Sequence, residues 1–201
     1  MNILTDTGPV VDRVAFLTEQ AATVLSRRIP VRFADAVCDH PQVAAWADRF
    51  AADPTRVPSL VLTGPTGTGK TRQCWGLLRK VVMAHATTGR RVRWEFTTHP
   101  ELNDQLRPKP DGSHAWALEP YLHAELLILD DLGAGKQSEW TGDSLHRLVD
   151  HRWSHMLPTV YSTNLTPAQL TDAVGDRIVS RLADSTRVAL KGSDRRREAA
   201  A

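Results

Sequence analysis

The sequence predicts an α/β fold in which a parallel β-sheet lies between layers of helices. One observation is a glycine-rich segment, residues 64–71, which follows an apolar run at 59–62 and precedes an amphipathic stretch at 71–86. The other is the order of the remaining patterns, because short apolar runs alternate with segments of helical periodicity along the chain. Such an alternation is typical of a doubly wound sheet, whose connections are helices on both faces.

The glycine-rich segment fits the phosphate-binding pattern G-x-x-x-x-G-K-[ST] at every fixed position. Its residues are Gly64, Pro65, Thr66, Gly67, Thr68, Gly69, Lys70 and Thr71. The glycines allow the backbone to direct successive N–H groups and a helix amino terminus at phosphate oxygens. In that arrangement Lys70 reaches the β and γ oxygens, and the Thr71 hydroxyl is a ligand of Mg²⁺. The pattern therefore predicts a site for a nucleoside triphosphate with Mg²⁺ rather than an ordinary glycine turn.

Size and composition favour one soluble α/β domain with a short appendage. The chain has 201 residues, of which 41% are hydrophobic and 24% are charged. Lys and Arg exceed Asp and Glu by only two, 25 against 23. Any nucleic-acid surface must therefore be local.

Several features of the sequence indicate a cytoplasmic protein. Cys38 and Cys74 are far apart and belong to no C-x-x-C pair, which argues against a disulfide framework or a structural zinc site. Residues 1–6 have neither the basic region nor the apolar core of a signal peptide. No apolar run approaches the length of a membrane span, so we expect no membrane partner.

The first predicted helix covers residues 9–28, where apolar residues recur at spacings of three and four. Pro9 suits the first helical turn, and two arginines stand at the carboxyl end, where cations interact favourably with the helix dipole. The narrow apolar stripe either packs on the domain that follows or docks a partner protein. Residues 29–37, interrupted by Pro30, are predicted to form a linker, and residues 41–52 a second helix.

After the phosphate loop, the pattern predicts a helix over 71–86 and a strand over 91–97, where polar and apolar residues alternate. Gly76 inside that helix costs about 1 kcal/mol relative to Ala, and we expect it to permit close packing on the sheet. Residues 99–120 contain four prolines and are predicted to be irregular. Core packing is the expectation for three tryptophans at apolar helical positions, Trp46, Trp75 and Trp153.

The fully apolar run at 126–129 ends in two carboxylates, Asp130 and Asp131. In an open parallel sheet, such a strand delivers its last residues to the crevice in which ligands bind. Downstream of a phosphate loop, this pattern fits the Walker B role. We therefore predict that Asp130 holds Mg²⁺, directly or through water, and that Asp131 polarises the attacking water.

The last third of the chain continues the alternation of helices and strands. The predicted elements are a helix at 138–155, a strand at 159–164, helices at 167–174 and 176–182, and an edge strand at 187–191. The strand at 159–164 ends in Asn164, which by the same sheet logic lies beside the γ-phosphate. Arg177 and Arg181 are spaced i, i+4 and therefore share one helix face.

Taken together, these patterns resemble the AAA+ ATPases of the DnaC, DnaI and IstB group over about residues 29–197. The motifs that carry the resemblance are IPVRF at 29–33, GPTGTGKT at 64–71, LLILDDLG at 126–133, the approach from DHR at 150–152 to PT at 158–159, STNL at 162–165, and the pair Arg177 and Arg181. A phosphate loop alone is generic to P-loop NTPases, whereas this ordered succession is much more specific. The resemblance implies an AAA+ core with its parallel sheet sandwiched between helices.

The resemblance also implies roles for polar residues outside the phosphate loop. By position, Asn164 resembles sensor 1, Arg181 resembles the arginine finger with Arg177 beside it, and Arg196 resembles the sensor 2 arginine, although both neighbours of Arg196 are also arginines. An arginine finger completes the charge neutralisation at the γ-phosphate of a neighbouring subunit. A homo-oligomer that forms with ATP, as a ring or a spiral, is therefore implied. On the residues alone, Arg177 and Arg181 instead fit a solvated face with local salt bridges.

Two features depart from the family pattern. Many AAA+ proteins carry Glu after the Walker B Asp, whereas Asp131 is shorter by a methylene. Slow hydrolysis, with ATP used mainly as a switch, is therefore expected. The amino-terminal part is very small and lacks the four-ligand zinc pattern of some loaders, so recognition of a helicase would rest on the helix at 9–28.

Two further motifs have competing interpretations. His151 and His155 are spaced as helix-borne zinc ligands can be, but no H-E-x-x-H pattern and no third ligand is evident, so solvated positions are expected. Trp116 follows a basic stretch at 107–114 in the segment predicted to be irregular. An aromatic residue beside cations is either a stacking platform for single-stranded DNA or an anchor for the loop.

The resulting prediction divides the chain into an amphipathic helical extension at 1–29, an AAA+ nucleotide-binding domain at 30–197 and a short tail at 198–201. The function implied by the resemblance is that of an ATP-dependent helicase loader, which binds a replicative DnaB-type hexameric helicase and single-stranded DNA during DNA replication. An IstB-like transposition helper, an ATPase that selects duplex DNA and activates a transposase, shares the same core. A third interpretation is a nucleotide-dependent scaffold that does not hydrolyse ATP.

Overall fold

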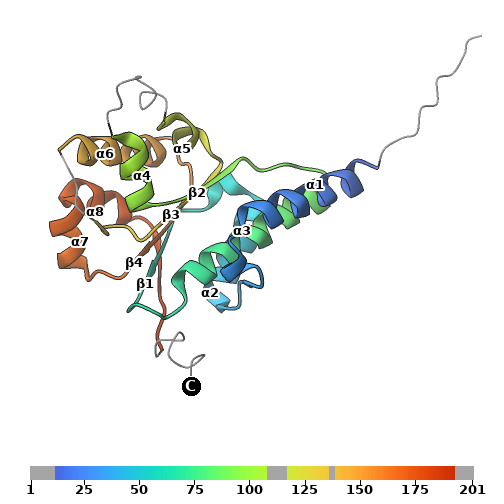
Figure 1. Cartoon of the computed structure of the whole chain (residues 1–201), viewed down its shortest axis with the longest axis horizontal. Helices are drawn as coiled ribbons and strands as arrows, with labels where there is room; N and C mark the ends of the chain where they lie inside the picture. The colour runs from blue at the N-terminus through green and yellow to red at the C-terminus, as the bar shows by residue number, and fades with distance from the viewer. Residues whose placement is uncertain (1–11, 108–116, 136–138, 193–201) are drawn as a thin grey trace, which may run out of the picture.

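The computed structural model describes residues 12–107, 117–135 and 139–192 (Figure 1). Within them, five parallel strands form one sheet in the order β2-β3-β4-β1-β5. The strands are β1 (Leu60–Thr63), β2 (Trp94–Thr98), β3 (Leu126–Asp130), β4 (Thr159–Thr163) and β5 (Thr186–Ala189). The predicted α/β fold with a parallel sheet is confirmed, and β5 is an edge strand as expected.

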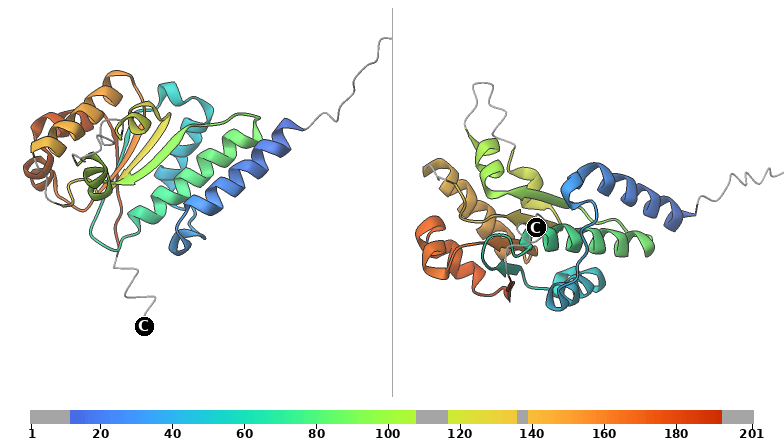
Figure 2. Two further views of the ribbon diagram at one scale, coloured as in Figure 1. Left: turned by 45° about the horizontal axis from the view of Figure 1, so that its top comes forward. Right: turned by 60° about the horizontal axis from the view of Figure 1, so that its bottom comes forward.

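Helices cover both faces of this sheet. They are α1 (Arg13–Arg28), α2 (Pro41–Ala52), α3 (Lys70–Thr87), α4 (His99–Leu106), α5 (Glu119–His123), α6 (Glu139–Ser154), α7 (Pro167–Val174) and α8 (Asp176–Leu182), with short 3-10 turns η1 (Val31–Phe33) and η2 (Pro54–Arg56). In Figures 1 and 2, α1 to α3 lie on one side of the sheet and α4 to α8 on the other. None of these described helices combines the length and the apolar character that crossing a membrane requires.

Alternation along the strands builds one hydrophobic core on each face of the sheet. Leu60 and Leu62 of β1 point into the core beneath α1, α2 and α3, whereas Val61 between them points into the core beneath the other helices. Strand β3 is apolar on both faces, as expected when helices cover both sides of a parallel sheet. Because β1 is paired on both sides, with β4 and with β5, the loop that follows it starts from a fixed position.

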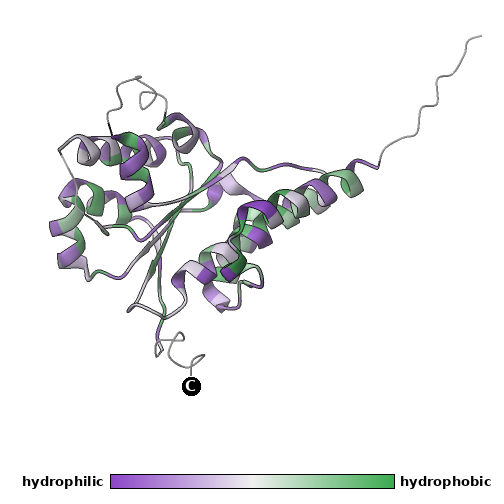
Figure 3. Ribbon diagram, viewed as in Figure 1, coloured by the Kyte–Doolittle hydropathy of each residue, from purple (hydrophilic) through white to green (hydrophobic). Residues whose placement is uncertain are grey.

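Helix α1 packs alongside α3 (Figure 1), so its apolar stripe contributes to the domain. Leu17 and Leu25 are buried in this contact. The helix begins at Arg13, where the Asp12 side chain accepts hydrogen bonds from the first helical N–H groups and caps the helix, and residues 9–11 of the predicted helix lie outside the described residues. Figure 3 shows that α1 carries both hydrophobic and hydrophilic residues, and part of its apolar surface stays exposed.

Helix α4 corrects the prediction that residues 99–120 are irregular. Thr98 and Glu101 form a capping box, in which the Thr98 hydroxyl accepts from the Glu101 N–H and the Glu101 carboxylate accepts from the Thr98 N–H. Pro100 lies in the first turn, where its missing N–H costs nothing. The T-x-x-E spacing at 98–101 is the sequence signal for the start of this helix, and the nearby prolines hide it.

Two further expectations about packing are wrong. Gly76 faces the chain at 37–38 and not the sheet, since a Cβ at this position would lie 2.3 Å from the Val37 carbonyl carbon. Trp153 is 48% exposed, because it lies on the outer face of α6, where its ring contacts Asp184 and Arg181. Trp46 and Trp75 are buried as predicted.

Candidate nucleotide-binding site

The carboxyl ends of three neighbouring strands bring the predicted site residues to one edge of the sheet. The phosphate loop follows β1, Asp130 ends β3, and Asn164 follows β4, which lies between β1 and β3. A cavity of about 450 Å³ opens at this edge. Its lining residues are Arg32, Phe33, Thr66, Gly67, Gly69, Lys70, Thr71, Arg72, Asp131 and Asn164.

The backbone of the phosphate loop turns sharply between β1 and α3. Gly64 has a φ of 146°, and a Cβ there would lie 2.3 Å from the Leu190 carbonyl oxygen, so a larger residue would not fit. Gly69, in the left-handed region, is the N-cap of α3. The amino end of α3 is therefore at the cavity, where its first N–H groups and the helix dipole favour an anion.

The Lys70 side chain folds back over the loop that precedes it. Its Nζ donates hydrogen bonds to the carbonyl oxygens of Gly64 at 2.7 Å and Pro65 at 2.8 Å. Only 5% of the residue is exposed, and it lines the cavity. A cation beside backbone N–H groups makes this end of the cavity attractive to a polyanion.

Thr71 and Asp130, the two predicted Mg²⁺ ligands, are in direct contact. Thr71 Oγ1 donates to Asp130 Oδ2 at 2.8 Å. Burial raises the pKa of the Asp130 carboxyl, while hydrogen bonds from Ser162 and Thr71 oppose that rise. A hydroxyl and a carboxylate beside a phosphate-binding loop provide the oxygen ligands that Mg²⁺ prefers. The residues present therefore fit this ion.

Ser162 on β4 contacts both acidic residues. Its hydroxyl donates to Asp130 Oδ1 and accepts from the backbone N–H of Asp131 at 3.0 Å. The residue is fully buried. The sequence patterns assign no role to Ser162, although the residue opens the STNL motif at 162–165, because a hydroxyl side chain is ordinary in a strand that also contains two threonines. Its place two residues before Asn164, on the strand beside β3, is the signal that identifies it.

Asp131 and Asn164 both line the cavity, as predicted from the ends of their strands. Asp131 has a φ of 54°, a left-handed conformation that Asp and Asn tolerate better than most residues. This turn directs the chain away from β3 immediately after Asp130. Asn164 is exposed at the end of β4. Lys70, Thr71, Asp131 and Asn164 thus share one cavity.

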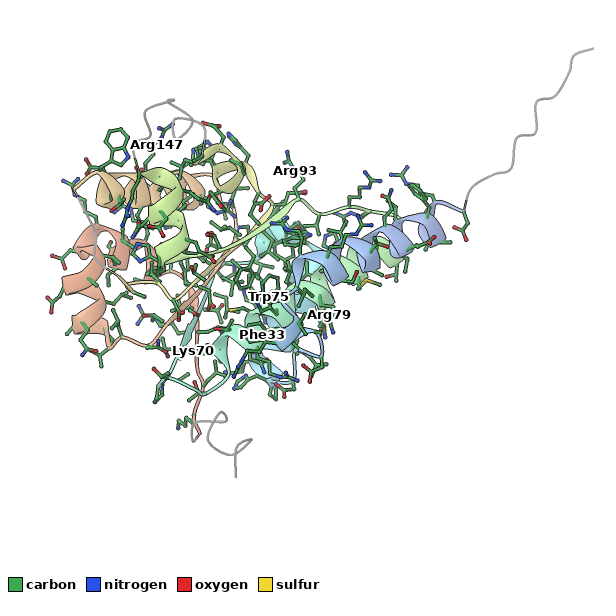
Figure 4. All side chains as sticks on the ribbon, in the orientation of Figure 1. Phe33, Lys70, Trp75, Arg79, Arg93 and Arg147 are labelled. Carbon is green, nitrogen blue, oxygen red and sulfur yellow. The ribbon has the colours of Figure 1, made fainter. Side chains whose placement is uncertain are left out.

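Arg32 and Phe33 also line the cavity, although the sequence predicts only a linker at this position. Figure 4 shows Phe33 near Lys70 at the amino end of α3. An ion pair of 2.9 Å between Arg72 Nη1 and Asp35 Oδ1 ties this segment to α3. An aromatic ring beside a phosphate-binding cavity suits contact with a nucleoside base. The IPVRF motif at 29–33 is the signal that could have identified these residues.

Arg181 and Arg177 lie on α8, away from this cavity. Arg181 Nη2 is 2.9 Å from Asp150 Oδ1, and its guanidinium carbon lies 5.2 Å from the ring centroid of Trp153. Arg181 lines a separate cavity of about 380 Å³, which residues preceding β1 and β4 also line. Arg177 is exposed. For Arg181, the local ion pair expected from the residues alone is therefore present.

Other predicted features lie elsewhere or outside the described residues. Arg196 and Trp116 fall outside them, so the sensor 2 assignment and the DNA-stacking platform stay predictions. The rings of His151 and His155 stack on each other with centroids 4.1 Å apart. Within the part of the chain that the structure describes, no group of three or more His, Cys, Asp or Glu side chains could hold a metal ion.

Comparison with known proteins adds an independent finding. The family model of the IstB-like ATP binding proteins matches residues 52–198. The replicative helicase loader DnaC of Escherichia coli (strain K12) is 21% identical over 126 residues, which cover 63% of this chain and 50% of DnaC. The chain thus spans about half the length of the curated relatives it matches.

Solved structures give the same fold. The crystal structure of the DnaC helicase loader superposes with a TM-score of 0.68 at 22% identity, covering 81% of this chain and 100% of that chain. The structure of DnaI gives a TM-score of 0.67 at 22% identity, covering 84% and 94%. At these identities the likeness establishes the fold alone. The predicted core, a parallel sheet between layers of helices, is confirmed.

Proposed function

Because the chain belongs to the family of IstB-like ATP binding proteins, we propose that it is an AAA+ ATPase that acts as a helicase loader of the DnaC type. In this proposal it binds ATP with Mg²⁺, hydrolyses ATP slowly and assembles with further copies of itself. It engages a replicative DnaB-type helicase and single-stranded DNA in the cytoplasm. The observation that carries the proposal is the one cavity shared by Lys70, Thr71, Asp131 and Asn164, with Asp130 hydrogen-bonded to Thr71.

The chain's own groups account for binding of the triphosphate. The N–H groups at the amino end of α3 and the Lys70 ammonium neutralise phosphate oxygens. Phe33 and Arg32 line the same cavity and would contact the base and sugar. Thr71 and Asp130 would hold Mg²⁺, which when bound supplies charge neutralisation at the β and γ oxygens.

Hydrolysis needs a group that positions and deprotonates a water beside the γ-phosphate. Asp131 lines the cavity and carries a carboxylate, so it can accept the proton of that water. Asn164 can donate a hydrogen bond from its amide to the same region. The short side chain of Asp131 reaches less far than the Glu of many AAA+ proteins, which supports slow turnover.

The position of Arg181 supports a role toward a second copy of the chain. It lines the cavity beside the amino ends of β1 and β4, whereas the phosphate loop lies at the carboxyl end of β1. An arginine so far from its own phosphate loop would contact the nucleotide of a neighbouring copy in such an assembly. Its pair with Asp150 is partly exposed, at 29% and 42% of the two side chains. Exchanging such a pair for a phosphate costs little.

A transposition helper of the IstB type remains the alternative, since the family model carries that name. The loader is favoured because the curated relative with a stated activity is a replicative helicase loader. Single-stranded DNA enters the proposal through the basic and aromatic composition at 107–116. A nucleotide-dependent scaffold is distinguished by phosphate release no faster than that of Lys70→Ala.

A capture experiment tests the partner. The tagged full chain and its Lys70→Ala variant are each incubated with native cytosol and ATP, and bound proteins are identified by mass spectrometry. We expect the wild type to retain the replicative helicase and Lys70→Ala to lose it. Deleting α1 is unsuitable here, since Leu17 and Leu25 are buried against the domain.

The other outcomes decide between the alternatives. Retention of a transposase in place of the helicase would establish the transposition helper. If the wild type retains neither, while phosphate release stays at the Lys70→Ala level, the scaffold replaces both motor functions.

A further inference from the structure

Two adjoining cavities lie between α1, the carboxyl end of α3 and β2. Their volumes are about 220 and 420 Å³. Both are lined by Val24, Val92 and Trp94, so they form one continuous depression. We call this depression the basic groove, because Arg28, Arg90, Arg91 and Arg93 line it as well.

The residues that line the basic groove carry a net positive charge. Among the described residues that line its two cavities, four are arginines and one, Glu95, is a carboxylate. The whole chain has an excess of only two positive charges. All four arginines are exposed, and Figure 4 shows Arg93 extending away from the ribbon. A ligand of the groove is therefore expected to be acidic.

The arginines retain capacity to bind such a ligand. Arg28 pairs with Glu95 at 2.8 Å and Arg93 with Glu125 at 3.5 Å, and every partner in these two pairs is at least 29% exposed. Pairs of this kind contribute about 0–1 kcal/mol and exchange readily. Arg91 donates a hydrogen bond to the neutral side-chain oxygen of Gln20, and no salt bridge of Arg91 is found within the described residues.

The surface between the arginines is apolar. Val24 is 44% exposed and forms the common wall of both cavities. Further along α1, Phe16 is 44% and Val14 is 40% exposed. A chain segment with apolar side chains on one face and carboxylates on the other could contact the apolar wall and pair with the arginines.

The aromatic residue in the groove argues against single-stranded nucleic acid as the ligand. Base stacking requires an open aromatic face. Trp94 is only 8% exposed, and the Arg28 guanidinium carbon lies 4.1 Å from its ring centroid. No base can stack where a guanidinium group already lies. A ligand that binds through phosphate groups alone would make no contact with the exposed Val24 side chain.

We propose that the basic groove docks an acidic amphipathic segment of a partner protein. Apolar side chains of the segment contact Val24 and Val92, and its carboxylates pair with Arg91 and Arg93. This inference goes beyond the proposed function and does not depend on ATP hydrolysis. The groove lies at the carboxyl end of α3 and the nucleotide cavity at its amino end, so the two sites are separate.

A peptide selection tests the proposal without a named partner. The full chain is used to select binders from a random phage-displayed library of peptides of about 16 residues, enough for roughly four helical turns. The selected peptide is then measured by fluorescence anisotropy, alongside a labelled oligothymidylate. The variant is Arg91→Glu with Arg93→Glu. The control of equal charge change is Arg49→Glu with Arg56→Glu, two exposed arginines outside the groove.

We expect selected peptides to be rich in Asp and Glu with apolar residues at helical spacing. Affinity should fall at least about tenfold in the groove variant and in Val24→Asp, and stay within about twofold in the control. Binding of an ATP analogue should persist in all variants, which shows that they fold. A consensus without acidic residues, no binder at all, equal loss in the control, or groove-dependent binding of the oligothymidylate alone would each overturn the proposal.

Discussion

The Ser162 hydroxyl donates a hydrogen bond to the Asp130 carboxylate, across the pair of strands β3 and β4. The same oxygen accepts a hydrogen bond from the backbone N–H of Asp131, the residue after Asp130. One buried serine thus fixes both the carboxylate proposed to hold Mg²⁺ and the start of the turn that carries the proposed base. The contact depends on the order of the sheet, since β4 lies beside β3 although α6 separates them in the chain.

Ser162→Ala should therefore slow ATP hydrolysis while leaving nucleotide binding within a few-fold. Loss of a buried partner costs about 1–3 kcal/mol, which corresponds to roughly five- to 150-fold in rate if it falls on the transition state. Burial raises the pKa of Asp130 and the serine opposes that rise. Without the serine the pKa rises further, so less carboxylate is present at low pH. The acidic limb of the rate profile should move to higher pH, and an unmoved limb would contradict the positioning role.

Lys70→Ala should abolish binding of a fluorescent ATP analogue, because it removes the buried cation of the phosphate loop. Lys80→Ala is the matched control: Lys80 lies on the same helix and pairs with Asp48 outside the cavity. Titration of both variants checks the expectation. Unchanged affinity in Lys70→Ala would remove the basis of the nucleotide site.

Asp131→Asn should reduce phosphate release by about a hundredfold or more, since an amide cannot accept a proton from water. ATP binding should persist. The substitution suits the φ of 54° at this position, because Asn tolerates the left-handed region as Asp does. Any loss of activity then reports on chemistry and not on backbone strain. Full turnover in this variant would place the base at another residue.

Arg181→Ala should leave ATP binding near normal and prevent ATP-driven assembly. Asp150→Asn provides the comparison, because it removes the ion pair of 2.9 Å while keeping the arginine. Light scattering with and without ATP measures both variants. Assembly of Arg181→Ala to the wild-type size would exclude the arginine-finger role, whereas assembly of Asp150→Asn is expected to be retained.

Gly76→Ala should destabilise the protein by about 1–3 kcal/mol, because the added methyl meets backbone atoms of Val37 and Cys38. In an open helix the same change would stabilise by about 1 kcal/mol. Ala45→Gly, at an exposed position of α2, measures that propensity in this chain. Urea unfolding gives both values. A more stable Gly76→Ala protein would show that the helix and the chain at 37–38 can separate.

Local sequence patterns predict most of this fold, because the tertiary structure requires the same residues that each pattern selects. The strand at 126–130 is recognised because helices cover both of its faces and make it continuously apolar. The phosphate loop is recognised because its backbone conformation requires glycine, as at Gly64, where a Cβ would not fit. Helix α4 is not predicted, because Pro100 in its first turn resembles a helix breaker and hides the capping box of Thr98 and Glu101.

Other residues of the candidate site escape prediction because their roles arise only from contacts between distant segments. Ser162 acts across the sheet on β3, and Phe33 reaches the cavity because an ion pair holds its segment on α3. Trp153 looks like a core residue from periodicity, yet it lies on the outer face of α6. Residues that stabilise their own helix, strand or loop leave a local sequence pattern, whereas residues that contact a distant element do not.

Helix α3 has 18 residues, so it extends for about 27 Å. Lys70 begins it in the nucleotide cavity, and Ala86 near its other end lines the basic groove. The two sites therefore lie at opposite ends of one helix. Linkage is reciprocal: by whatever factor ATP changes the affinity of the groove, an acidic segment in the groove changes the affinity for ATP by that same factor.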